Sequence, residues 1–204
     1  MKYIAHRINT LEELAKIPQE YGIEIDIRDS LKVVHDPFMP GIDLEELLKQ
    51  YKHKFIILNI KSERIEYAIL DLLEKYQIKD YFFLDSSFPM IYKLTSCSDK
   101  DNDNEKNRNV AIRFSEYERS IMEMKGRCDW IWVDSFNDVL SLNKKDYQAF
   151  KEAGFKFCFV SPELHGYPVE TIEKFAKTMI ADGMVPDMIC TKVYNIHLWK
   201  NYFA

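Results

Sequence analysis

The feature of this sequence that most restricts its fold is a regular alternation of strand-like and helix-like segments over 204 residues. Eight short runs are rich in β-branched and aromatic residues, and most intervals between them show helical spacing of apolar residues. The strand-like runs are residues 2–7, 23–28, 55–61, 81–85, 110–114, 130–134, 155–160 and 188–193. The helix-like segments are residues 10–19, 44–51, 63–76, 116–125, 144–153 and 169–181.

Alternation of this kind predicts a parallel sheet, and eight repeats favour its closure into a barrel. The predicted fold is a compact, single-domain (β/α)8 TIM barrel with short loops that covers residues 1–204. An open, doubly wound sheet is the alternative. The polar segment 97–109 lacks apolar periodicity and is predicted to be a mobile loop.

Two positions carry signals for the start of a helix. Thr10 and Glu13 have the spacing of a capping box, in which each side chain accepts a backbone hydrogen bond of the other residue. Ser62 stands where a serine N-cap is expected before the segment 63–76.

Charge and cysteine content restrict the partners and the compartment. The net charge of −5 argues against binding to nucleic acid or to an anionic membrane, because such partners require a basic face. No apolar run approaches the length of a bilayer span, so no membrane insertion is expected. Cys97, Cys128, Cys158 and Cys190 show no C-x-x-C spacing, and no signal-peptide-like region precedes the first strand. A reduced, cytoplasmic protein with cysteines as small apolar fillers is predicted.

Polar residues gather where the predicted strands end, which is the end of a (β/α)8 barrel that carries the active site. They are His6, Arg7, Asp26, Arg28, Asn59, Lys61, Asp85, Arg113, Asp134, Ser161, Glu163, Thr191 and Lys192.

Glu24 and Asp26 are two residues apart in a strand, so both side chains project to one face while the isoleucines take the other. Adjacent inward carboxylates repel unless a cation compensates them. A hard divalent cation, Mg²⁺ or Ca²⁺, suits oxygen ligands. The alternative is an internal ion pair with Arg28 or Lys61 and no metal.

Two histidines bracket this acidic pair. His6 ends the first strand and His35 follows the second, and imidazole suits proton transfer near neutral pH. We expect His53, His165 and His197, which fall in loop or helix contexts, to be structural or solvated.

The motifs around these residues resemble those of the glycerophosphodiester phosphodiesterase family. That family shows H-R, then E-x-D, then H-D near its N-terminus, and this chain has IAHR at residues 4–7, EID at 24–26 and VVHD at 33–36. Weaker similarity continues in LNIK at 58–61 and SSF at 86–88.

The resemblance implies a barrel enzyme, a phosphoric diester hydrolase, that cleaves a small glycerophosphodiester-like substrate with one divalent cation. The implied roles are general acid and base for His6 and His35, cation ligands for Glu24, Asp26 and Asn59, phosphate binding for Arg7 and Lys61, and candidate additional roles for Asp85, Arg113 and Asp134. Whether water or a substrate hydroxyl attacks the phosphorus is left open.

The chain departs from the family pattern in four places, one of which is a shortened loop that keeps Asn9 and Thr10 but lacks the acidic residue before them. Ile8 replaces a glycine after H-R, Asn59 replaces an acidic ligand, and residues 37–54 are too few for a capping subdomain. These departures favour, as an alternative, a non-catalytic barrel that binds a phosphorylated ligand. A further alternative is a barrel enzyme with an imine-forming lysine, Lys61 or Lys192.

Overall fold

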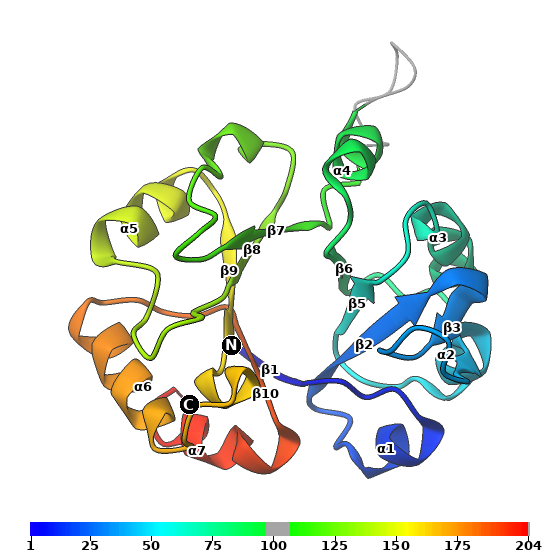
Figure 1. Cartoon of the computed structure of the whole chain (residues 1–204), viewed down its shortest axis with the longest axis horizontal. Coiled ribbons are helices and arrows are strands. Elements are labelled where there is room, and N and C mark those ends of the chain that lie inside the picture. Colours follow the sequence, from blue (N-terminus) through cyan, green and yellow to red (C-terminus); the bar gives the residue numbers. More distant parts are fainter. Residues whose placement is uncertain (97–106, 204) are drawn as a thin grey trace. The chain divides into compact units, whose positions relative to one another are not determined.

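The computed structural model describes residues 1–96 and 107–203 and shows a mixed α/β protein (Figure 1). The chain forms two compact units. The N-terminal unit is Ala5–Val110, and the C-terminal unit combines Met1–Ile4 with Ala111–Ala204. Most of the segment predicted to be a mobile loop, residues 97–106, lies outside the described residues.

The N-terminal unit contains a sheet in the order β4-β3-β2-β5-β6, with β2, β5 and β6 parallel. Its strands are β2 (Gly22–Arg28), β3 (Lys32–Val33), β4 (Ile42–Asp43), β5 (Ile56–Ile60) and β6 (Tyr81–Leu84). Its helices are α1 (Leu11–Lys16), α2 (Leu44–Gln50), α3 (Glu66–Lys75), α4 (Phe88–Thr95) and the 3-10 turn η1 (Asp29–Leu31). The antiparallel pairing of β3 with β2 and β4 forms a hairpin at one edge.

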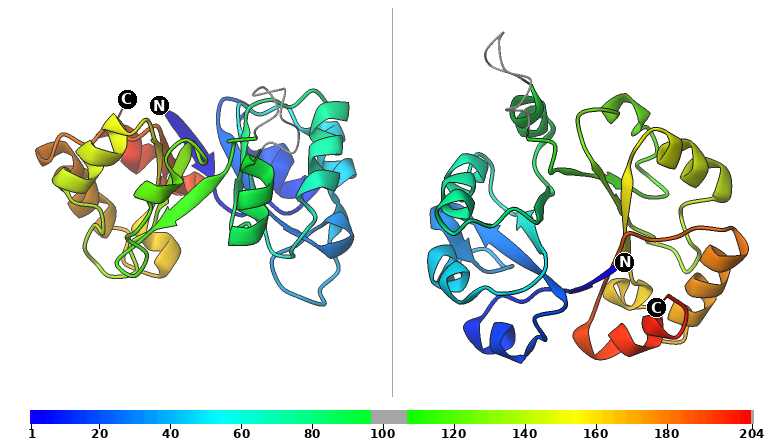
Figure 2. Two further views of the ribbon diagram at one scale, coloured as in Figure 1. Left: turned by 90° about the horizontal axis from the view of Figure 1, so that it is seen from above. Right: turned by 180° about the vertical axis from the view of Figure 1, so that it is seen from behind.

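The C-terminal unit contains strands in the order β1-β10-β9-β8-β7, and β7 to β10 pair in parallel. Its strands are β1 (Lys2–Ala5), β7 (Ala111–Phe114), β8 (Trp130–Val133), β9 (Lys156–Val160) and β10 (Met188–Thr191). Its helices are α5 (Lys144–Glu152), α6 (Thr171–Ala181), α7 (Ile196–Lys200) and the 3-10 turns η3 (Met122–Met124), η4 (Pro162–His165) and η5 (Val193–Asn195). Both ends of the chain lie side by side here (Figure 2), and the Tyr3 hydroxyl donates to the Phe203 carbonyl.

All eight predicted strand-like runs form strands, which confirms the strand predictions. Five of the six predicted helices are also present, but the helix predicted over 116–125 is wrong. Ser115 Oγ accepts hydrogen bonds from the backbone N–H groups of Tyr117 and Glu118, and only the short turn η3 follows. The serine side chain thus offers this backbone an alternative to the helical hydrogen bonds.

The two predicted helix starts have opposite outcomes. Thr10 and Glu13 form the complete capping box of α1, as predicted. The Ser62 prediction is wrong, because α3 begins at Glu66 and the Ser62 hydroxyl instead donates to Asp29 Oδ1 and accepts from the Asp29 N–H. That serine holds the end of β2 to the end of β5.

Strand β2 is buried on both faces, and its register places the acidic residues. Ile23, Ile25 and Ile27 are fully buried. In the parallel pairing with β5, Asp26 lies beside Asn59. Side chains of adjacent residues in this register share a face of the sheet, so an amide lies next to the acidic pair.

Cys128, Cys158 and Cys190 are buried, as the prediction of small apolar fillers requires, whereas Cys97 lies outside the described residues. Among the described residues, no helix has both the length and the apolar character that a bilayer span requires.

Candidate active site

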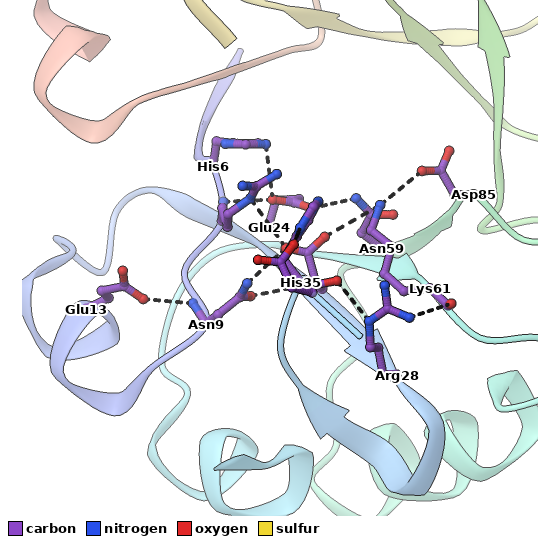
Figure 3. A network of polar contacts seen from close by, with 12 residues as sticks. His6, Asn9, Glu13, Glu24, Arg28, His35, Asn59, Lys61 and Asp85 are labelled. Carbon is purple, nitrogen blue, oxygen red and sulfur yellow. Dashed lines mark hydrogen bonds and ion pairs between the residues drawn. The ribbon is translucent and has the colours of Figure 1, made fainter. Parts of the chain in front are cut away.

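A network of polar contacts joins the residues at the carboxyl ends of β1, β2, β5 and β6 (Figure 3). Every residue of this network belongs to the N-terminal unit, because that unit begins at Ala5.

Glu24 is almost fully buried, and both of its carboxylate oxygens accept hydrogen bonds. Oε2 accepts from the Arg7 backbone N–H at 2.7 Å, and Oε1 accepts from Asn59 Nδ2 at 2.8 Å. Burial and the nearby charge of Asp26 nevertheless raise the pKa of Glu24 to about 7. The protein alone therefore compensates the ionised form of Glu24 incompletely.

Asp26 is equally buried and is held from several sides. The Asn9 side chain makes two hydrogen bonds to it, since Nδ2 donates to Asp26 Oδ2 and Oδ1 accepts from the Asp26 backbone N–H, both at 2.9 Å. Lys61 Nζ lies 3.6 Å from Oδ1, and Arg7 Nε lies 3.6 Å from Oδ2. Lys61 also lies 3.4 Å from Asp85 Oδ2, so its charge is shared between two carboxylates.

Of the two predicted acid-base histidines, His6 contacts the acidic pair. Its Nε2 lies 3.8 Å from Glu24 Oε2, and its side chain is 17% exposed. The His35 ring is more exposed, and its Nδ1 lies 2.7 Å from Asp36 Oδ1, a contact that lowers the pKa of Asp36. The chain beside His35 is tied to the site, because the Val34 N–H donates to the Asp26 carbonyl.

Arg28, which we considered as an ion-pair partner of the acidic pair, has a different contact. Its Nε donates to the His35 carbonyl at 2.8 Å, and its Nη1 lies 3.4 Å from the Lys61 carbonyl. The cations near Asp26 are Arg7 and Lys61 instead. Arg28 thus fixes the backbone that carries His35.

The sequence interpretation missed Asn9 as a site residue. Glu13 Oε2 accepts from the backbone N–H groups of Asn9 and Thr10, so the capping box of α1 also orients Asn9 toward Asp26. The available signal was the position of Asn9 directly before a capping box, close to the H-R motif.

The position of Ile8 is explained by its neighbour. Arg7 has a φ of 56°, so the left-handed backbone conformation falls on Arg7 and Ile8 does not have to adopt it. Ile8 is buried, and its N–H donates to the Glu24 carbonyl at 2.8 Å. An isoleucine is therefore accommodated in the core beside the site.

The oxygen donors of this site fit a hard divalent cation. Asn59 Oδ1 is buried and has no hydrogen-bond partner in the described part of the chain, which is costly for a carbonyl oxygen. A cation near the two carboxylates would satisfy this oxygen and compensate Glu24. Over residues 1–96 and 107–203, no group of three or more His, Cys, Asp and Glu side chains is placed to hold a metal ion, so a cation here would require the Asn59 amide oxygen as a third protein ligand.

The other predicted candidates, Arg113 and Asp134, pair with each other in the C-terminal unit. Buried Asp134 also accepts from Trp132 Nε1 at 3.0 Å and lies 2.9 Å from His165 Nε2. Burial and the Arg113 charge lower the pKa of His165. His165, which we expected to be structural or solvated, thus belongs to a buried polar cluster.

The described elements place this chain in the class of mixed α/β proteins. No protein-family model matches the chain, and no curated protein is significantly similar in sequence. Among solved structures, a protein assigned as a glycerophosphodiester phosphodiesterase from Galdieria sulphuraria superposes with a TM-score of 0.65 and 17% identity, over 98% of this chain and 97% of that one.

Two further structures carry related descriptions. A glycerophosphoryl diester phosphodiesterase from Parabacteroides distasonis has a TM-score of 0.60 and 13% identity, over 100% of this chain and 87% of that one. A glycerophosphodiester phosphodiesterase from Agrobacterium tumefaciens has a TM-score of 0.58 and 14% identity, over 98% and 99%. The resemblance indicated by the sequence motifs is confirmed at the level of the fold.

Proposed function

We propose that this chain is a metal-dependent phosphodiesterase that cleaves a small glycerophosphodiester-like substrate, with His6 and His35 as general acid and base. The proposal rests on one observation above all. Two buried carboxylates, Glu24 and Asp26, lie on one face of β2, with an imidazole 3.8 Å from the first and two cationic side chains 3.6 Å from the second. The fold shared with glycerophosphodiester phosphodiesterases supports the same conclusion.

The chain's own residues suit the charge of a phosphodiester. Arg7 and Lys61 supply positive charge for the phosphate oxygens, where negative charge grows in the transition state. One imidazole takes a proton from the attacking hydroxyl or water, and the other gives a proton to the leaving alkoxide. His6, beside Glu24, is held in place for one of these transfers.

In this proposal Glu24, Asp26 and Asn59 hold one divalent cation, Mg²⁺ or Ca²⁺. When bound, the cation supplies Lewis-acid stabilisation of the phosphate charge. Asn9 acts as a positioning residue, because its two hydrogen bonds fix the Asp26 carboxylate.

Turnover of a panel of glycerophosphodiesters with Mg²⁺ or Ca²⁺ tests this function. We expect His6→Ala and His35→Ala each to lower kcat by about 10²–10⁴-fold, with unchanged thermal unfolding. His197→Ala, at an exposed position on α7, is the matched control and should keep full activity. Full activity of both site variants would contradict the assigned roles.

A second candidate function is non-catalytic binding of a phosphorylated ligand, which the amide at position 59 favours. Asn59→Glu distinguishes the two functions, because a third carboxylate strengthens binding of a hard cation. For the enzyme we expect about tenfold tighter Mg²⁺ or Ca²⁺ binding in a calorimetric titration, and no such gain in Asn59→Gln. Imine chemistry at Lys61 is disfavoured, because its Nζ already contacts the carboxylates of Asp26 and Asp85 and does not stand in a dry pocket without counter-charges.

We further propose that the strands close into the (β/α)8 barrel predicted from the sequence. The eight strands at the predicted positions and the shared fold support this closure.

A further inference from the structure

An exposed apolar tip follows His35 in the connection between β3 and β4. We name residues 37–40, the sequence Pro-Phe-Met-Pro, the PFMP tip. The Phe38 side chain is fully exposed, with a relative accessibility of 104%, and Met39 is 59% exposed. Single exposed apolar residues are common on protein surfaces, but two large adjacent ones at the apex of a hairpin form a protruding apolar feature.

The backbone around the tip is fixed. Two prolines restrict its ends, and Phe38 has a φ of 63°. A Cβ added to Gly41 would lie 2.7 Å from the Val33 carbonyl oxygen, so the returning chain packs closely on β3. The hairpin thus holds Phe38 in its outward position. Binding of Phe38 to a partner would therefore cost little conformational entropy.

The tip adjoins the candidate active site. A cavity of about 410 Å³ has His35 and Asn9 among its lining residues and also Val33, Met39 and Pro40 of the hairpin. One wall thus belongs to the polar network around Asp26, and another wall is apolar. A small, fully polar phosphodiester does not need the apolar wall, whereas a phosphodiester that carries a hydrocarbon chain does.

We propose that the PFMP tip inserts into the surface of a zwitterionic lipid aggregate, and that the phosphodiester acted on belongs to a lipid headgroup. The second part rests on the proposed phosphodiesterase function and names its substrate class. The proposal revises the expectation of no membrane insertion, because a tip at the interface differs from a segment that spans the bilayer.

The charges near the tip favour a zwitterionic surface over an anionic one. Lys32 is paired with Asp43 at 2.7 Å, and Arg28 is bonded to the His35 carbonyl. Asp36 and Asp29 lie close to the tip in the chain, and the net charge of the protein is −5. The two basic side chains that line the cavity at the tip, Arg28 and Lys32, are thus engaged by protein groups, which disfavours an anionic surface, whereas an exposed phenylalanine such as Phe38 suits insertion at a lipid interface.

A protein partner is less consistent with this shape. A fully exposed, convex phenylalanine needs a pocket in its partner, whereas a lipid surface accepts it without a matching shape. Self-association of this chain through the tip is the competing outcome, and sedimentation velocity measures it directly.

The experiment uses the full chain with phosphatidylcholine vesicles, lysophosphatidylcholine micelles and soluble glycerophosphocholine. We expect Phe38→Ser to weaken vesicle binding by roughly tenfold or more, as removal of a buried aromatic ring implies. The same variant should lower turnover of the micellar lipid and leave turnover of the soluble diester within about twofold. Val185→Ser, at a position 61% exposed before β10, is the control and should bind vesicles normally.

Each result bears on one part of the proposal. Equal vesicle binding by the wild type and Phe38→Ser overturns the interfacial tip, as does tip-dependent self-association without lipid binding. Turnover of the soluble diester but not of the lipid overturns the lipid substrate while the phosphodiesterase function stands. If no diester is cleaved, the proposed function and the lipid substrate fail, and vesicle binding still decides the role of the tip.

Discussion

At the scale of single residues, the central question is how two carboxylates remain side by side in the interior. Glu24 and Asp26 are each 1% exposed, so water screens their repulsion poorly. Arg7 and Lys61 approach Asp26, whereas the hydrogen bonds that Glu24 accepts from the Arg7 backbone and the Asn59 amide come from uncharged groups. The raised pKa of Glu24 follows from this asymmetry.

This raised pKa predicts how stability depends on pH without divalent cations. The pKa of Glu24 rises from 4.5 to about 7 in the folded protein. Between these values the unfolded chain has released the proton and the folded chain has kept it, so the free energy of unfolding falls as pH rises and stays lower above pH 7. The loss is on the order of 3 kcal/mol.

Denaturant unfolding in a chelator from pH 4 to 8 measures this loss. The side chain in Glu24→Gln cannot titrate, so the free energy of unfolding of this variant should not show this fall with pH. Saturating Mg²⁺ or Ca²⁺ should restore the stability of the wild type at pH 8. A wild-type profile that matches the Glu24→Gln profile would show that Glu24 ionises normally.

At the scale of elements, strands were predictable because apolar and β-branched runs mark them directly. The absence of a helix over 116–125 was not predictable in this way. The Ser115 hydroxyl accepts backbone hydrogen bonds there, and a pattern of side-chain polarity does not reveal such a contact. The hairpin β3–β4 also escaped prediction, since two strands of two residues carry no readable alternation.

The candidate site was also predictable only in part. The acidic pair on one face of β2 and the cationic Lys61 follow from the two-residue period of a strand. The Asn9 contacts with Asp26 join residues 17 apart through a turn and a capping box, so sequence spacing alone does not specify them.

The hairpin gives a prediction about an element. Gly41→Ala should destabilise the protein by about 1–3 kcal/mol, because its new methyl group would lie 2.7 Å from the Val33 carbonyl oxygen and 2.9 Å from Val34 Cβ. Turnover should fall as well, since His35 follows Val34 directly. Met39→Ala, an exposed change in the same hairpin, should shift stability by less than about 0.5 kcal/mol. Equal denaturation midpoints for the two variants would contradict the close packing of Gly41.

At the scale of the whole molecule, the proposed barrel closure has its own test. In the N-terminal unit Phe83 of β6 already pairs with Val110, and its N–H donates to the Asn109 carbonyl. A closed barrel continues this pairing along β6 and β7, which gives hydrogen-bond partners to the amides that face away from β5 and β8. An open sheet leaves those amides to water.

Amide hydrogen exchange of the intact protein, resolved by residue, distinguishes the two architectures. For a closed barrel we expect the amides of β6 and β7 to exchange as slowly as those of β2 and β5, because their opening requires sub-global unfolding. The amides of β4, at the edge of the hairpin, serve as the internal control and should exchange rapidly. Rapid exchange at alternate residues of both β6 and β7 would instead identify two free sheet edges, and the chain would then be an open sheet.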